Sequence, residues 1–229
     1  MLDSAKRTII TFISTYFFWL AFFALNRAIF LLYNMDDLSG IGLSDLLSTF
    51  IHAIYLDTSA ACYIMVVPFL FHAVGMFWPK RFIFHIISVI TYLFIFLVAL
   101  IYVGELGIYD AWSGSKLNYK ALSHLATPDE VVNSTSYSFF FGMLGLTALV
   151  TFIGIWAYRK FIHTVVDSRT RNWWVAGLFT LLTPVLLGIG IRGGAQQIPI
   201  NQSDVFFSDE HYVLNVAAVN SPWNLFHSI

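Results

Sequence analysis

Five long apolar stretches dominate this sequence and restrict the folds that are open to it. They run over residues 9–33, 51–78, 82–104, 137–158 and 173–191. A helix needs about 20 mostly apolar residues to cross a bilayer, whose interior offers no water to backbone polar groups. The stretches are too long for the strands of a membrane barrel, and charged residues make up only 11% of the chain. The sequence therefore predicts an all-α integral membrane protein with a bundle of five transmembrane helices.

Lysine and arginine are distributed unevenly between the segments that join these stretches. One side of the predicted bundle would carry Lys6, Arg7, Lys80, Arg81, Arg159, Lys160, Arg169 and Arg171. The opposite side would carry Lys116, Lys120 and Arg192. Because positive loops favour the cytoplasm, we predict a cytoplasmic amino terminus and an extracytoplasmic carboxyl-terminal tail. The net charge of −1 gives no reason to expect a nucleic-acid partner.

The outer segment between the third and fourth stretches, residues 105–136, is too long for a simple turn. Residues 127–130, TPDE, have the order of an N-cap, a first-turn proline and acidic first-turn residues. Residues 116–125 place leucines at helical spacing and leave Lys116 and Lys120 for a polar side. We expect short interfacial helices in this outer loop, although an ordinary loop packed over the bundle fits the same residues.

Two ionisable residues fall inside predicted membrane helices, where a charge is costly and usually serves a site or a buried pair. Arg27 lies about six residues before the outer end of the first helix, and Asp57 about six residues after the outer start of the second. At 1.5 Å per residue, both would lie roughly 9 Å below the outer interface. They are therefore placed to form a pair.

Further polar residues lie toward the same side of the predicted bundle. A guanidinium group suits phosphate because it offers planar, bidentate hydrogen bonds at fixed charge. We therefore predict a lipid-headgroup site formed by Asn26, Arg27, Asp57, Ser59, Tyr63, Glu105 and Arg192. The alternative is that Arg27 extends to the surface and Asp57 only neutralises it, without binding a ligand.

The tail from residue 192 onward is more polar than the stretches before it, and we interpret it as a hydrated connector on the outer side. Asp209, Glu210 and His211 are adjacent, but three consecutive polar residues in such a tail are more typical of a turn than of a metal site. We find no motif of a phosphate loop, nucleophile elbow or zinc site. No catalytic residue and no metal ligand is therefore predicted in this chain.

The polar positions together resemble the membrane portion of the lipoteichoic acid synthase family. Two matches lie in the membrane: Asn26, Arg27, Ile29 and Phe30 in the first helix, and Asp57, Ser59 and Tyr63 in the second. The more specific match is the connector pattern of Arg192, Gly193, Gly194, Pro199, Ile200, Asn201, Phe207, Asn215, Ala217, Ala218, Asn220, Pro222, Trp223 and Asn224. The resemblance extends over essentially the whole chain.

The resemblance implies a membrane domain, residues 1–191, and a connector, residues 192–229, that leads to a sulfatase-like catalytic domain absent from this chain. In the family, that domain uses a manganese or magnesium ion to transfer phosphoglycerol from phosphatidylglycerol. The expected role is membrane anchor and admission of lipid substrate, with phosphatidylglycerol and the catalytic domain as partners, in a bacterial inner membrane. Two alternatives stay open: a stand-alone non-catalytic membrane subunit that binds a protein or lipid, and the membrane domain of a phosphoethanolamine transferase.

Overall fold

The computed structural model describes residues 2–78, 80–111, 114–120, 136–162 and 173–228. Within these ranges the chain forms helices and no strands. The five long helices are α1 (Leu2–Tyr33), α2 (Leu43–Phe77), α3 (Arg81–Ala111), α6 (Tyr137–Phe161) and α7 (Trp173–Ile191), and each is long and apolar enough to cross a membrane. The predicted class, an all-α bundle with five membrane-spanning helices, is confirmed.

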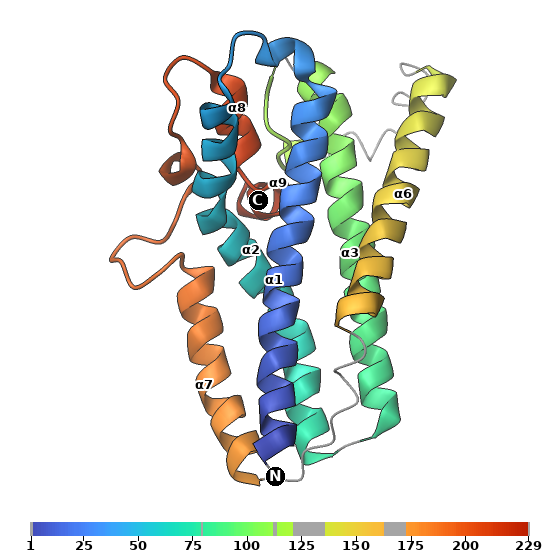
Figure 1. Ribbon diagram of the computed structural model, residues 1–229, viewed down its shortest axis with the longest axis vertical. Helices are drawn as coiled ribbons and strands as arrows, with labels where there is room; N and C mark the ends of the chain where they lie inside the picture. The colour runs from blue at the N-terminus through green and yellow to red at the C-terminus, as the bar shows by residue number, and fades with distance from the viewer. Residues whose placement is uncertain (1, 79, 112–113, 121–135, 163–172, 229) are drawn as a thin grey trace.

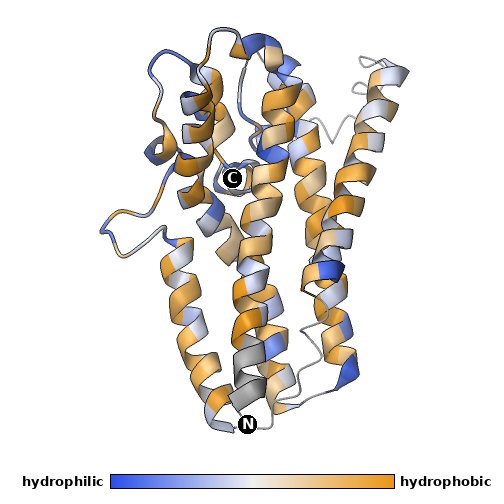
Figure 2. Ribbon diagram, viewed as in Figure 1, coloured by the Kyte–Doolittle hydropathy of each residue, from blue (hydrophilic) through white to orange (hydrophobic). Residues whose placement is uncertain are grey.

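The long helices run alternately up and down, with α1, α2 and α3 at the centre of the bundle (Figure 1). The outer helices are α7, which packs along α2, and α6, which packs along α3 (Figure 1). Most residues of these helices are hydrophobic, as the colours of Figure 2 show, and many of their large apolar side chains are exposed, which suits contact with lipid. Which end of the bundle faces the cytoplasm stays a prediction.

At the end of the bundle where the connector lies, two helices extend beyond the predicted stretches. Helix α2 begins at Leu43 rather than near residue 51, and α3 continues to Ala111 rather than ending near residue 104. Hydropathy detects only the part of a helix that is apolar enough for hydrocarbon, whereas these extensions are stabilised by packing against other protein segments. The predicted helix at residues 127–130 lies outside the described residues.

The outer helices α6 and α7 each pack closely against the central helices at a glycine residue. A Cβ atom added to Gly154 of α6 would lie 2.7 Å from Ile95 and 2.8 Å from Phe22. A Cβ atom added to Gly190 of α7 would lie 2.3 Å from the sulfur of Cys62, which is itself buried against this helix. Small residues permit such close packing in membranes, where burial of apolar surface gives no net driving force.

The connector, residues 192–229, does not extend into water but folds back onto the bundle (Figure 1). Its described part contains η3 (Gln202–Val205), α8 (Tyr212–Ala218) and α9 (Ser221–His227), while η1 (Met35–Leu38) lies between α1 and α2. Helices α8 and α9 contact α2, α8 also contacts α1, and α9 also contacts α3. Every residue from Val213 to Leu225 is buried. The interpretation of the whole tail as hydrated is therefore wrong, because its polar side chains find partners inside the protein.

Candidate functional site

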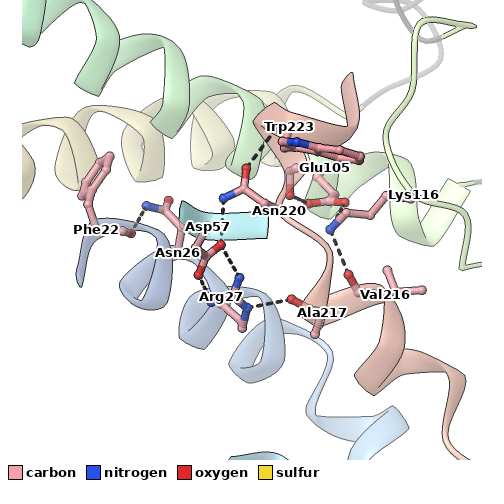
Figure 3. Close-up of polar contacts among 11 residues, drawn as sticks. Phe22, Asn26, Arg27, Asp57, Glu105, Lys116, Val216, Ala217, Asn220 and Trp223 are labelled. Atoms are coloured by element: carbon pink, nitrogen blue, oxygen red, sulfur yellow. Dashed lines mark hydrogen bonds and ion pairs between the residues drawn. The ribbon is translucent and has the colours of Figure 1, made fainter. Parts of the chain in front are cut away.

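The candidate site is a buried polar network that joins α1, α2 and α3 to the connector (Figure 3). Arg27 and Asp57 form its first ion pair. The two terminal guanidinium nitrogens donate to the two carboxylate oxygens at 2.9 and 2.8 Å. Arg27 is 1% exposed and Asp57 3% exposed, so neither reaches the surface. The predicted pairing of these residues is confirmed, and the alternative in which Arg27 extends to the surface is wrong.

The connector supplies further hydrogen-bond partners to this first pair. The third guanidinium nitrogen, Nε of Arg27, donates to the carbonyl of Ala217 at 2.8 Å, and the side-chain amide of Asn220 donates to Asp57 at 2.8 Å. A buried charge is tolerated when it is paired and its other hydrogen-bonding positions are filled. Here the connector supplies both of these partners, from residues more than 160 positions away in the sequence.

A second ion pair joins Glu105 to Lys116, with 2.8 Å between the carboxylate and the ammonium nitrogen. The same ammonium group donates to the carbonyl of Val216 at 3.0 Å, and the hydroxyl of Ser221 donates to the other carboxylate oxygen. Burial lowers the pKa of Lys116, and the neighbouring carboxylate opposes that effect. In both ion pairs, the basic residue donates to a backbone carbonyl of the connector and the carboxylate accepts from a connector side chain.

Lys116 was expected on the polar face of an interfacial helix, and that expectation is wrong because the side chain is buried. Sequence reasoning also did not include Ser221 in the site. Charge alone could have indicated the second pair. Glu105 directly follows the third predicted stretch and has no basic residue within one helical turn of it, and Lys116 is one of few basic residues on that side of the predicted bundle.

The other predicted site residues divide into those that join the network and those that do not. The hydroxyl of Ser59 accepts from the indole nitrogen of Trp223 at 3.0 Å and donates to the carbonyl of Ile191 at 2.6 Å, so it joins α2, α9 and the end of α7. Asn26 is buried beside Arg27, but its amide donates to the carbonyl of Phe22 on its own helix at 2.7 Å.

Arg192 and Tyr63 lie outside the network. The exposed guanidinium of Arg192 donates to the carbonyls of Gln196 and Gln197 and so fixes the turn that begins the connector. Tyr63 is 45% exposed, and its hydroxyl lies 3.5 Å from the Nε2 atom of His227. Lipid-headgroup binding by the seven residues stays a prediction, although each of the three guanidinium nitrogens of Arg27 donates to a protein acceptor in this conformation.

The remaining connector-motif residues form turns or caps rather than reactive groups. Gly193 and Gly194 have positive φ angles of 81° and 135°, which glycine adopts without strain. Pro199 is exposed in the following turn, and Asn201 caps η3 in a capping box with Asp204. The side chain of Asn220 caps α9 by accepting from the backbone N–H of Trp223, besides donating to Asp57.

No reactive or metal-binding arrangement accompanies the network. Among the described residues, no group of three or more His, Cys, Asp or Glu side chains is placed to hold a metal ion. The manganese or magnesium ion that the resemblance implies was expected in the absent catalytic domain, and that stays a prediction. Comparison with known protein families, with curated proteins and with solved structures finds no match.

Proposed function

We propose that this chain is the membrane domain of a phosphoglycerol transferase of the lipoteichoic acid synthase type, and that it anchors the enzyme and fixes the position of its connector. The observation that carries the proposal is the meeting of Arg27 and Asp57 with Ala217 and Asn220. These residues come from the three separate stretches on which the family resemblance rests. A shared role in one buried network gives that resemblance a physical reason.

The network suits a positioning role better than a catalytic one. Both ion pairs are buried, and both are hydrogen-bonded to the connector, which they hold on the bundle. A domain that follows such a connector would be held at a defined height and orientation above the bilayer. Transfer chemistry, and the manganese or magnesium ion that it needs, would then belong to that domain. Lipid admission through the Arg27 and Asp57 region would require the connector to leave first.

The intact mass of the native protein, extracted from its own membranes, tests the anchoring proposal directly. A species with several hundred additional residues would support it, whereas a species that ends at Ile229 would overturn it in favour of a stand-alone membrane subunit. The headgroup in the products separates the two transferases: phosphoglycerol supports this proposal, and phosphoethanolamine supports the alternative enzyme.

The positioning role is tested in the full-length protein by Arg27→Glu, with Arg159→Gln as the control for loss of a positive charge at an exposed position on α6. At equal expression, we expect turnover of phosphatidylglycerol to fall for Arg27→Glu and to stay at the wild-type level for the control. Equal turnover in all three proteins would remove the positioning role and leave simple anchoring.

The proposed orientation in a bacterial inner membrane places the connector outside. The loop between α1 and α2 lies at the connector end of the bundle, and the link between α2 and α3 lies at the opposite end (Figure 1). Ser39 is an exposed residue of the first segment, and Lys80 is an exposed residue of the second. After substitution by cysteine, we expect a membrane-impermeant thiol reagent to label position 39 in intact cells and position 80 only after permeabilisation. The reverse pattern would invert the topology. Cys62, the chain's own cysteine, is buried.

A further inference from the structure

A short segment between α3 and α6, residues 114–120, lies against the connector, and we call it the Lys116 segment. Among the described residues, three hydrogen bonds join it to the connector: the ammonium of Lys116 to the carbonyl of Val216 at 3.0 Å, the amide of Asn224 to the carbonyl of Leu117 at 2.8 Å, and the backbone N–H of Tyr119 to the hydroxyl of Ser228 at 2.8 Å. The contact therefore extends along the segment and does not depend on the ion pair alone.

Local hydrogen bonds hold the Lys116 segment in one shape. The side chain of Asn118 donates to the carbonyl of Lys116 at 3.3 Å and accepts from the backbone N–H of Lys120 at 3.0 Å. Asparagine commonly stabilises turns through such bonds to its neighbouring backbone. Neither bond involves the connector, so the turn can be loosened at Asn118 without removal of a contact between the two segments.

Glu105 of α3 binds the Lys116 segment and the connector at the same time. One carboxylate oxygen pairs with the ammonium of Lys116 at 2.8 Å (Figure 3), and the other accepts from the hydroxyl of Ser221. Glu105 is 0% exposed, and a buried carboxylate requires such partners. If the connector left, water would reach this pair, and a solvated ion pair holds two segments together only weakly.

We infer that the Lys116 segment and connector residues 212–228 form one conformational unit, which docks on the bundle and leaves it as a whole. Coupling of this kind is reciprocal: whatever stabilises the docked Lys116 segment stabilises the docked connector by the same free energy. The chain between α3 and α6 is thereby a regulatory input. A molecule that holds or displaces the Lys116 segment sets the fraction of the protein in which the connector is docked.

Hydrogen exchange of backbone amides, measured by mass spectrometry on the purified chain in detergent, reports the opening of each segment. Tyr119 is a direct reporter, because the acceptor of its backbone N–H is the connector residue Ser228. Over a series of low urea concentrations, we expect residues 114–120 and 212–228 to open with the same free energy and the same dependence on urea. Two different openings would overturn the inference without any substitution in the chain.

Asp57→Ala tests the coupling from the connector side. Asp57 accepts hydrogen bonds from Arg27 and from Asn220 of the connector, and from no group of the Lys116 segment, all of which is described. We expect exchange in residues 114–120 to accelerate by the same factor as exchange in residues 212–228. The first turn of α6 lies at the same end of the bundle (Figure 1) and should exchange at the wild-type rate. Acceleration in the connector alone would refute the inference.

Asn118→Ala tests the coupling from the other side, because it loosens the turn of the Lys116 segment and leaves its connector contacts in place. We expect exchange in residues 212–228 to accelerate about fivefold, as the loss of one hydrogen bond of about 1 kcal/mol predicts. The matched control is Ser136→Ala, which removes the side chain that caps α6 and should leave connector exchange unchanged. Unchanged connector exchange in Asn118→Ala, or an equal rise in the control, would contradict the coupling. None of these measurements needs transferase activity, so the inference fails or succeeds separately from the proposed function.

Discussion

Asp57→Ala is the perturbation that most directly tests the buried network as a clamp on the connector. The substitution leaves the guanidinium of Arg27 buried without its counter-ion and the amide of Asn220 without its acceptor. Loss of one partner from a buried pair costs about 3–5 kcal/mol, and an orphaned amide adds about 1 kcal/mol. The chain can avoid this cost by releasing the connector, which admits water to Arg27. We therefore expect the population with a released connector to rise by roughly 10³- to 10⁴-fold.

Limited proteolysis of the detergent-solubilised chain measures that population, because the cleavage rate follows the open fraction when reclosing is fast. The appearance of fragments that end within the connector should accelerate in Asp57→Ala. The double variant Arg27→Met, Asp57→Leu removes both charges and should cleave more slowly than the single variant. Asp45→Ala, at an exposed carboxylate of α2, should cleave at nearly the wild-type rate. A wild-type rate for Asp57→Ala, or a double variant that cleaves faster than the single one, would refute the reasoning.

Three further substitutions test separate parts of the structure. Gly154→Leu should force α6 away from its neighbours at a cost of about 1–3 kcal/mol and so lower the thermal unfolding midpoint in detergent. The control Gly142→Ala should not lower that midpoint, because a Cβ atom added there meets nothing within 4 Å. Gly193→Ala places a side chain at a φ of 81° and should destabilise the docked connector by about 1–2 kcal/mol, which a higher cleavage rate between α7 and α8 would report. Lys116→Met leaves a buried carboxylate unpaired and should raise connector cleavage as Asp57→Ala does, unless the second ion pair contributes nothing.

The spans and the first ion pair could be predicted because both depend on local information. A spanning helix is specified by its own length and hydropathy, and the depth of a residue within it follows from its distance to the helix end. Arg27 and Asp57 occupy equivalent depths by this count, and they do meet. The inference needed only that consecutive helices are neighbours.

The docked connector could not be predicted in this way. A hydropathy scale counts Asn215, Asn220 and Asn224 as polar residues that prefer water, but the side-chain amide of each is hydrogen-bonded to protein groups. Asn215 bonds the backbone of residues 207 and 208. Asn224 donates to the carbonyl of Leu117. A buried asparagine is acceptable when its partners are present. The partners of Asn220 and Asn224 come from distant parts of the chain, so their presence depends on tertiary structure. The pairing of Glu105 with Lys116 was not predicted because Lys116 was expected on the polar face of an interfacial helix, whereas its side chain is buried.

The sequence separation within the network has a consequence for biosynthesis. Arg27 and Asp57 are 30 residues apart and can meet as soon as the first two helices have left the ribosome. Their connector partners, Ala217 and Asn220, are 190 and 163 residues away and are translated only after all five long helices. During that interval the paired charges must wait in a partly assembled bundle, where they are costly and accessible to water. Docking of the connector would then be the last step in the assembly of the membrane bundle, and a quality-control protease that recognises exposed intramembrane charge would distinguish assembled bundles from unassembled ones by this step.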